Sequence, residues 1–323
     1  MQIIGKNRNK KGEEKMKNGK LQVAVVGCGG IANQKHFPAL TNQADKCEIT
    51  AFCDIIEERA RKAAEKYGAE GAKVYTDYQE LLKDESIDVV HVCTPNVAHC
   101  PITVAAFEAG KHVMCEKPMA ATTEDAQKMM DAWKKSGKKF TIGYQNRFRT
   151  DAQALKRICE EGKLGDIYFA KAHAVRRRAV PTWGVFPDKS KQGGGPLIDI
   201  GTHALDITLW CMDNYSPKTV TGSVFEKLGH LPEATEGNMF GPWDTKTYEV
   251  EDSAFGYVKM ENGAIAFFEG KGGGSPADKE CKQWLEAIIE DKEPLVKPEQ
   301  AFVVTQILDT IYKAAAEGHE IAL

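Results

Sequence analysis

Asp199 and His203 have the residue types and the spacing that proton transfer requires. They are four positions apart, so a helix that begins near Pro196 would place both side chains on one face. A histidine beside a carboxylate can accept and return a proton near neutral pH, while the carboxylate orients the imidazole or a substrate. Such a pair is often only structural. The glycine run at 193–195, which permits an unusual helix entry, favours the catalytic interpretation.

Lys117 is the third residue with a plausible chemical role. It lies in the sequence Glu116-Lys117-Pro118, directly after an apolar run, where a parallel strand is expected to end. Ligands bind at this carboxyl edge in open α/β sheets, and a lysine ammonium there can stabilise a developing oxyanion. Pro118 restricts Lys117 to extended backbone and makes a cis peptide bond more accessible. A solvated surface lysine is the alternative.

Residues 21–54 predict the element that would hold a cofactor beside these groups. An apolar run at 21–26 predicts a buried strand, and it leads into the pattern G-x-G-x-x-A. Such a turn is tight, lets backbone approach a pyrophosphate and packs closely against the strand. The residues expected to contact the cofactor here are Gly27, Gly29, Gly30, Ile31 and Ala32. A turn without any nucleotide is the alternative.

Asp54 ends the second apolar run, about 20 positions beyond the glycines. A carboxylate at this place hydrogen-bonds the ribose hydroxyls of an adenosine. The same carboxylate would repel a ribose 2′-phosphate, so the sequence favours NAD over NADP.

Strand and helix signals alternate from residue 21 to about 145, which predicts an α/β fold with a doubly wound parallel sheet. Strands are expected at 21–26, 48–53, 74–75, 88–92, 112–118 and 138–145, and helices at 55–68, 78–86, 97–109 and 122–137. The loop Thr94-Pro95-Asn96 would therefore leave the same sheet edge as Lys117.

The pattern changes after residue 145. Residues 146–323 predict an α+β domain with an open, mostly antiparallel sheet, whose C-terminal helix is able to pack back on the first domain. Strands are expected at 167–175, 220–228, 249–260 and 263–270, and helices at 151–161, 277–290 and 298–317. Residues 176–186, with three arginines and Trp183, predict a loop over a polar ligand, or else an irregular loop with solvated arginines.

The composition excludes several classes of function. A net charge of −3 gives no sign of a nucleic-acid partner, and no apolar run approaches the roughly 18 residues that span a membrane. Nine cysteines without a C-x-x-C pair favour reduced thiols and a cytoplasmic protein, and no spacing of ligands predicts a metal. The polar, basic residues 1–20 predict a disordered extension, or an arm that touches an anionic partner.

Five motifs occur in a characteristic order: VAVVGCGGIA, VCTPNVAH, CEKPMA, GYQNRF and GGGPLIDIGTHALD. Together they resemble the Gfo/Idh/MocA family of sugar and polyol oxidoreductases, from residue 21 nearly to the end. The resemblance implies a Rossmann domain followed by a domain whose open sheet often makes oligomer contacts. It therefore implies a homo-oligomer, a dimer or tetramer, that acts on a sugar or polyol.

The resemblance also implies roles for single residues. Lys117 would contact the reacting hydroxyl and the nicotinamide ribose, His203 would be the general acid/base, and Asp199 would orient the substrate or the imidazole. Candidates for contacting the cofactor at the strand ends are Thr94, Pro95, Asn96, His99, Glu116 and Lys117. Asn96 and His99 are also candidates for shaping the substrate pocket, together with Gln145, Arg147, Arg176 and Trp183.

The sequence thus predicts an NAD-dependent dehydrogenase that acts on a ring hydroxyl of a sugar, glycoside or cyclitol, with C3 of a sugar as an attractive position. An enzyme that retains NAD and cleaves glycosides by transient oxidation and elimination is one alternative, and a non-catalytic sugar sensor is another. One departure from the family is visible after Gly270, where KGGGSP follows the last strand at once. Either the sheet is reduced, or a segment is missing from the sequence.

Overall fold

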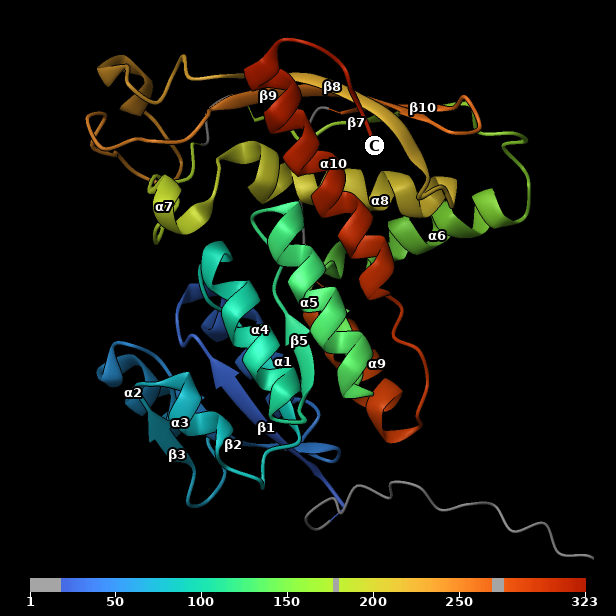
Figure 1. Ribbon diagram of the computed structural model, residues 1–323. Helices are drawn as coiled ribbons and strands as arrows, with labels where there is room; N and C mark the ends of the chain where they lie inside the picture. Colours follow the sequence, from blue (N-terminus) through green and yellow to red (C-terminus); the bar gives the residue numbers. More distant parts are fainter. Residues whose placement is uncertain (1–18, 177–179, 269–275) are drawn as a thin grey trace, which may run out of the picture.

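The computed structural model describes residues 19–176, 180–268 and 276–323. In these ranges a parallel sheet forms the first half of the chain, and a mixed sheet with long helices forms the second half (Figure 1). Three expectations fall wholly or mostly outside the described residues: the basic extension, two of the three arginines at 176–178, and the segment that follows Gly270.

The first sheet has the strand order β3-β2-β1-β4-β5-β6, and every pair is parallel. Its strands are β1 (Leu21–Val26), β2 (Cys47–Cys53), β3 (Lys73–Tyr75), β4 (Val89–Val92), β5 (His112–Cys115) and β6 (Phe140–Ile142). The order turns outward from β1 in both directions, which confirms the doubly wound prediction. Strand β5 is shorter than expected because its continuation runs into Pro118, which has no N–H to donate to a ladder.

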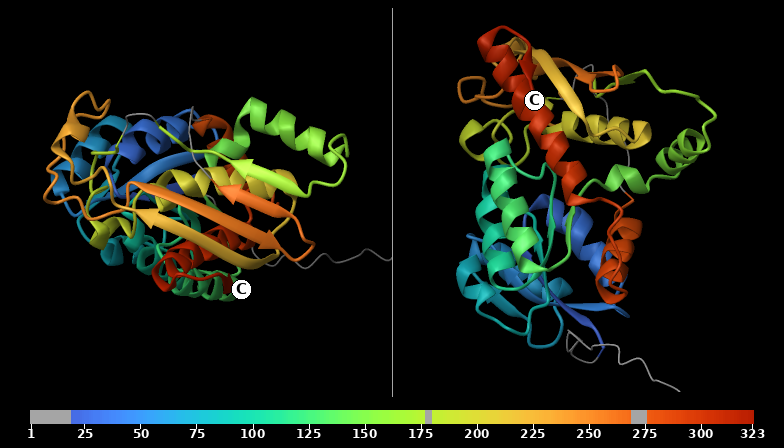
Figure 2. Two further views of the ribbon diagram at one scale, coloured as in Figure 1. Left: turned by 90° about the horizontal axis from the view of Figure 1, so that it is seen from above. Right: turned by 45° about the vertical axis from the view of Figure 1, so that its right-hand side comes forward.

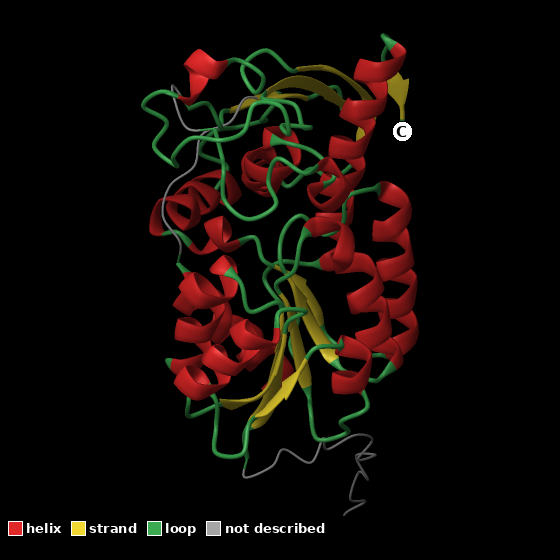
Figure 3. Cartoon of the chain, turned by 90° about the vertical axis from the view of Figure 1, so that its left-hand side faces the viewer, coloured by secondary structure: helices red, strands yellow, loops and turns green. Residues whose placement is uncertain are grey.

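Helices cover both faces of this sheet (Figure 3). They are the π-helical turn η1 (Ala32–His36), α1 (Phe37–Thr41), α2 (Glu57–Tyr67), α3 (Tyr78–Leu82), the 3₁₀ turn η2 (Asn96–Ala98), α4 (His99–Glu108) and α5 (Thr123–Ser136). Their limits follow local chemistry: Thr122 caps α5 by accepting the Asp125 N–H at 3.2 Å, and Gly137 ends it with a φ of +68°. The helix after the glycine turn begins with the wider π turn η1 and continues as α1.

The second half begins with η3 (Gln145–Phe148) and builds an open sheet of order β11-β8-β9-β10-β7. All its strand pairs are antiparallel except β10–β7, and seen from above the strands lie in front of the helices (Figure 2). The remaining elements are α6 (Thr150–Glu160), β7 (Phe169–Ala172), α7 (Lys189–Gln192), η4 (Leu197–Gly201), α8 (Thr202–Met212), β8 (Pro217–Phe225), η5 (Pro232–Thr235), β9 (Ser253–Met260), β10 (Ile265–Phe268) and β11 (Ile321–Ala322). Strand β7 is much shorter than the predicted strand at 167–175.

Two C-terminal helices join the halves. Helix α10 (Pro298–Glu317) contacts α5 and β6 on one side and β8 on the other, so a single apolar core runs through both units. Helix α9 (Ala277–Ile289), which the sequence analysis placed in the second domain, packs on the first: Trp284 and Leu285 share a core with Phe37. Within the described ranges, no helix combines the length and the apolar character that crossing a bilayer demands.

Candidate active site

Lys117, Asp199 and His203 meet at the carboxyl edge of the first sheet. Lys117 lies in the turn after β5, and its Nζ is 2.8 Å from Asp199 Oδ1 and 3.0 Å from the Asp199 carbonyl oxygen. Asp199 lies on η4, and His203 follows in the first turn of α8. The Lys117–Pro118 peptide bond is cis. The fold therefore brings Lys117 to Asp199 and His203, which lie more than 80 positions further along the chain.

The charges in this group follow from burial and from the ammonium. Burial alone would raise the pKa of Asp199, but the Lys117 ammonium outweighs it and the pKa falls below its usual value. Burial, with the same ammonium next in importance, lowers the pKa of His203 to about 3. The expectation of a histidine that titrates near neutral pH is therefore wrong. The imidazole is neutral and can accept a proton, and its buried Nδ1 has no hydrogen-bond partner.

The glycine run before Asp199 has a structural cause. Glu251 accepts the N–H groups of Gly195 (2.8 Å) and Leu197 (3.0 Å), and Tyr312 donates its hydroxyl to the same carboxylate at 2.8 Å. A Cβ at Gly194 would collide with the Tyr312 hydroxyl, and one at Gly195 with the Glu251 carbonyl oxygen. The glycines thus permit close packing, so they are not evidence of catalysis. The helix that follows begins as the π turn η4, where the sequence predicted an α-helix.

The glycine turn after β1 has the shape expected for a dinucleotide. Gly27 has a φ of +94° and donates its N–H to Cys53 at 2.8 Å, and a side chain there would strike the Cys93 carbonyl. Gly29 has open space where a Cβ would point, and Gly30 and Ile31 are exposed. Ala32, by contrast, is fully buried against the sheet. Backbone therefore remains open to a ligand at the start of the helix.

Asp54 lies at the end of β2, beside this turn. One of its carboxylate oxygens accepts the Cys28 N–H at 2.8 Å and the other accepts the Ile56 N–H at 2.9 Å. Each oxygen keeps a further lone pair for a hydroxyl donor. The turn and the carboxylate together fit the adenosine half of a dinucleotide. The open backbone of the turn suits the pyrophosphate, and the Asp54 carboxylate suits the ribose hydroxyls.

The segment after β4 combines partly exposed residues at the sheet edge with two buried residues that connect it to neighbouring segments. Thr94 and Pro95 remain at least partly exposed at the sheet edge. His99 is fully buried, with one ring nitrogen 2.8 Å from the Pro118 carbonyl and the other 2.9 Å from that of Thr94. Its predicted contact with the cofactor or the pocket is therefore wrong: the ring fastens two loops together. Asn96 is also buried, and it donates to the Gln192 carbonyl at 2.8 Å, which connects this loop to α7.

Glu116 was expected to contact the cofactor, but its carboxylate turns into the protein. The side chain is 5% exposed, and its Oε1 is 2.7 Å from Lys35 Nζ and 2.8 Å from His36 Nε2. Glu280 of α9 lies on the other side of Lys35, at 2.8 Å. The sequence analysis did not single out these partners. The available signal was a set of polar residues inside apolar runs, such as His91 in the middle of β4.

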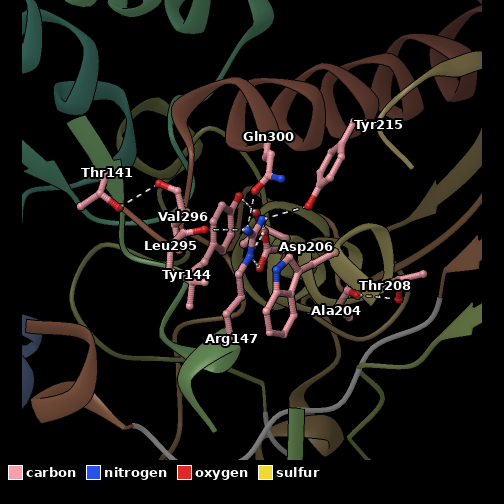
Figure 4. A network of polar contacts seen from close by, with 12 residues as sticks. Thr141, Tyr144, Arg147, Ala204, Asp206, Thr208, Tyr215, Leu295, Val296 and Gln300 are labelled. Carbon is pink, nitrogen blue, oxygen red and sulfur yellow. Dashed lines mark hydrogen bonds and ion pairs between the residues drawn. The ribbon is translucent and has the colours of Figure 1, made fainter. Parts of the chain in front are cut away.

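Arg147 was expected in the substrate pocket, and this expectation is also wrong (Figure 4). Its guanidinium has no exposed surface and forms a two-pronged ion pair with Asp206, whose side chain is equally buried. Further donors reach Gln300 at 2.6 Å and Tyr215 at 3.3 Å. A guanidinium with these partners has no free side for a substrate. Gln145 is partly exposed, and its side-chain oxygen lies 3.4 Å from Lys35 Nζ.

Arg176 and Trp183 both lie close to Phe240. The positive charge of Arg176 is among the charges that lower the pKa of Asp199, so Arg176 lies near enough to act on the partner of Lys117. Its guanidinium also lies 5.6 Å from the ring centroid of Phe240, which in turn meets Trp183 edge-to-face at 4.5 Å. Trp183 is 46% exposed. Phe240, which the sequence analysis missed, thus joins the two predicted residues into one surface.

No set of three or more His, Cys, Asp or Glu side chains within the described ranges is arranged to hold a metal ion. Among the described residues, Lys117, Asp199 and His203 combine an ammonium, a carboxylate and a neutral imidazole.

Two family models match the chain in succession. The model of the oxidoreductase family with an NAD-binding Rossmann fold, GFO/IDH/MocA, matches residues 21–144. The model of the GFO/IDH/MocA C-terminal domain matches residues 152–280. The second match includes η4 and the first turn of α8, so the two models together cover all three candidate catalytic residues.

Curated relatives and solved structures agree with these models. The chain is 42% identical over 254 residues to the D-glucoside 3-dehydrogenase of Escherichia coli, covering 79% of this chain and 71% of that protein. It is 34% identical over 201 residues to the inositol 2-dehydrogenase of Salmonella paratyphi B, covering 62% of this chain and only 56% of that protein. An aldose-aldose oxidoreductase from Caulobacter crescentus, solved with glycerol, superposes with a TM-score of 0.78 at 23% identity, covering 94% of this chain and 100% of the other. At that identity, the structural likeness shows the fold.

Proposed function

The chain belongs to the GFO/IDH/MocA family of oxidoreductases, and from this we propose that it is an NAD-dependent dehydrogenase. It would transfer a hydride between the nicotinamide and a secondary hydroxyl carbon of a sugar, glycoside or cyclitol. The observation that carries the proposal is the meeting of Lys117, Asp199 and His203 beside an open glycine turn. A cation, an anion and a neutral base at one sheet edge are what alcohol oxidation needs.

The proposed mechanism assigns one task to each of the three side chains. Bound at this edge, the nicotinamide supplies the hydride acceptor. The Lys117 ammonium binds the reacting hydroxyl and stabilises the oxyanion as the O–H bond breaks. The neutral imidazole of His203 takes the hydroxyl proton at Nε2, because Nδ1 is buried. Asp199 holds the ammonium in place, and its negative charge stabilises the imidazolium that forms.

The cofactor proposal rests on the glycine turn and on Asp54. The backbone of Gly27, Gly29 and Gly30 would receive the pyrophosphate, and the Asp54 carboxylate would accept the ribose hydroxyls. NAD is favoured over NADP because the carboxylate would face a 2′-phosphate of the same sign.

The substrate is proposed to be a glycoside larger than one free sugar. Trp183 and Phe240 offer an apolar surface, and Arg176 adds a cation to the same surface. Sugar rings stack on such aromatic faces while their hydroxyls bind charged groups. The relative from Escherichia coli is named for a D-glucoside and for position 3, which agrees with C3 as the reacting carbon.

Neither alternative function gains support from the relatives. The relatives named above are dehydrogenases, and neither name indicates glycoside cleavage. A sensor would need no catalytic base. A cleaving enzyme would release an aglycone without net NADH, so the two enzyme functions give different products from the same substrate.

Two further proposals concern the whole molecule. The face of the second sheet that carries Phe169, Phe225 and Phe255, all more than a third exposed, supports assembly into a homo-oligomer through this sheet. Nine free thiols support a location in the reducing cytoplasm. Light scattering with size-exclusion chromatography tests the first, and fractionation of the source cells tests the second.

The test of function is an absorbance assay for NADH with a panel of sugars, cyclitols and glycosides. We expect NADH from one class, and its loss in Lys117→Ala and in His203→Ala. NAD bound tightly with aglycone release and no net NADH would transfer the assignment to the glycoside-cleaving enzyme. Sugar binding without any reaction would support the sensor.

A further inference from the structure

A buried cluster of charged and polar side chains lies directly beneath the Lys117 turn. Its members come from elements far apart in the sequence: Lys35 and His36 on η1, His91 on β4, Glu116 at the end of β5, and Glu280 on α9. Each ion-pair member is at most 5% exposed. Burying charge in this way is costly unless the geometry is well satisfied, so the cluster calls for an explanation other than simple stability.

The hydrogen bonds of the cluster converge on one oxygen of Glu116. Lys35 Nζ lies 2.7 Å from Oε1 and His36 Nε2 lies 2.8 Å from it. His36 Nδ1 is 3.0 Å from His91 Nδ1, and burial lowers the pKa of both rings, so they are neutral. His36 therefore donates from Nε2 to the carboxylate and accepts at Nδ1 from His91. This assignment satisfies every contact among the three residues.

The second oxygen of Glu116 reaches the catalytic turn. Oε2 accepts the backbone N–H of Lys117 at 3.1 Å. Gly143 lies against the carboxyl group, and a Cβ there would come within 3.1 Å of its atoms, so the glycine leaves room for the carboxylate. From this fixed backbone the Lys117 side chain extends to Asp199 at 2.8 Å. The carboxylate thus connects the buried cluster to the backbone that carries the candidate catalytic ammonium.

Glu280 shows that the cluster is not arranged for maximum stability. It approaches Lys35 at 2.8 Å, yet neither of its buried oxygens makes a well-aligned hydrogen bond. Burial raises its pKa to about 7, and the Glu116 carboxylate adds to this rise, although Lys35 opposes it. An apolar residue at 280 would avoid this cost. What the cluster provides is a fixed position for Glu116.

We propose that Glu116 is a positioning residue for Lys117, and that Lys35 and His36 hold Glu116 in place. This inference rests on the proposed dehydrogenase function, since it concerns the ammonium that would bind the reacting hydroxyl. Lys35 and His36 lie on the helix that follows the glycine turn. The helix that would receive the cofactor pyrophosphate would therefore also position the backbone of the Lys117 turn. It does so through two successive contacts, from Lys35 and His36 to Glu116 and from Glu116 to the Lys117 N–H.

Glu116→Gln is the direct test. The glutamine has the same shape, but its amide group cannot accept both from Lys35 and His36 and from the Lys117 N–H, so one set of contacts is lost. We expect kcat to fall about 10- to 100-fold, with the KM values for NAD and sugar changed by less than about threefold, because a small displacement of a reacting group lowers the rate strongly. In a Lys117→Ala background the same change should have no further effect on kcat.

Two further variants separate positioning from folding. Asp206→Asn weakens another buried ion pair, which includes neither Glu116 nor Lys117, and should lower Tm without the loss of kcat. Gly143→Ala pushes on the Glu116 carboxyl without removing its charge, so it should lower kcat in the same direction even if Glu116→Gln folds poorly.

A measurement without turnover keeps this inference distinct from the proposed function. Labelling of Lys117 with an amine-reactive reagent, followed by mass spectrometry, should proceed several-fold faster in Glu116→Gln than in the wild type or in Asp206→Asn, because the lysine is less firmly held. If the wild type oxidises no sugar but the labelling changes, the proposed function fails and the positioning role stands. Unchanged labelling, or an equal loss of kcat in the Lys117→Ala background, would overturn the positioning role.

Discussion

Two ion pairs reach the consecutive helices η4 and α8, one from the turn after β5 and one from η3, and they differ in burial and in the number of their partners. Lys117 Nζ contacts one carboxylate oxygen and the carbonyl oxygen of Asp199, and the two side chains are 17% and 13% exposed. Arg147 binds Asp206, seven residues further along, with both partners fully buried. Arg147 also donates to Gln300 and Tyr215 (Figure 4). His203, by contrast, follows Asp199 by one turn and keeps a ring nitrogen without a partner.

The difference teaches how to recognise a site among buried charges. An ion pair whose hydrogen-bonding groups all have protein partners holds two segments together, and no donor or acceptor remains to bind a ligand. A pair with exposed surface and unsatisfied neighbours retains capacity for a substrate, at some cost in stability. The sequence did not distinguish Arg147 from Lys117, because the family resemblance implied a place in the site for both.

The largest expected effect is on the open pair. Lys117→Met removes the ammonium that would stabilise the oxyanion, so kcat should fall about 10³-fold. The Tm should change little, because the lost pair is partly solvated. Lys73→Met, which removes an exposed lysine from its pair with Asp84, is the control and should match the wild type in both. A fall in Tm with normal kcat would reverse the assignment of the two pairs.

The closed pair should respond in the opposite way. Asp206→Asn leaves the Arg147 cation buried without a full counter-charge, which should lower the free energy of unfolding by about 3 kcal/mol. Denaturant titration measures this. The kcat of the remaining folded protein should stay within about threefold of the wild type. A loss of kcat as large as that of Lys117→Met would show that the second pair also belongs to the site.

His203→Asn sharpens the comparison at the unpaired imidazole. Loss of the proton acceptor should lower kcat about 10²-fold, with little change in the KM for NAD. Because the wild-type imidazole stays neutral to about pH 3, its protonation should not limit kcat/KM between about pH 5 and pH 7. A bell with its acid limb near pH 6.5 that disappears in the variant would contradict the low pKa.

The same variant makes a prediction about stability and pH. Residue 203 binds a proton below about pH 6.5 in the unfolded chain, but only below about pH 3 in the folded one. The unfolded state therefore gains protons first, and the wild type loses stability as the pH falls from about 6 to 4. His203→Asn should lose it less steeply. The slope should not vanish, because burial also lowers the pKa values of His36, His91 and His99.

The smallest expected effect concerns the loop surface. Trp183→Ala should raise KM about tenfold for a disaccharide or an aryl glucoside and leave methyl glucoside unchanged, because only the larger ligands reach the aromatic surface. Tyr168→Ala is the control, since it removes another exposed aromatic ring to which no role is assigned. An equal change for every substrate would indicate damage to the loop.

Much of the fold was predictable because local patterns determine it. The alternation of strands and helices, the glycine turn and the strand ends at Asp54 and Lys117 depend on residues close in the sequence. Asp199 and His203 could likewise be paired from their spacing alone, since one helical turn separates them whether the turn is α or π.

Other features depend on elements that are far apart in the sequence. Glu116 and Lys117 are neighbours, yet one side chain points inward to Lys35 and the other outward to Asp199. His99 and Arg147 stand in motifs that resemble a binding site, but the loops and helices packed around them leave them no open side. Short-range patterns cannot predict which of two polar neighbours is buried.

The sequence by itself determined the layers, the edge of the sheet that carries the site, and the identity of three groups able to do the chemistry. The tertiary structure alone decided the protonation and the position of these groups. The pKa of His203 depends on burial beneath distant segments and on Lys117. In our proposal, the position of Lys117 depends on Glu116, which Lys35 and His36 hold in place. The physical reason is that residue types and short-range periodicity are written along the chain, whereas desolvation and ion pairing depend on which segments pack together in space.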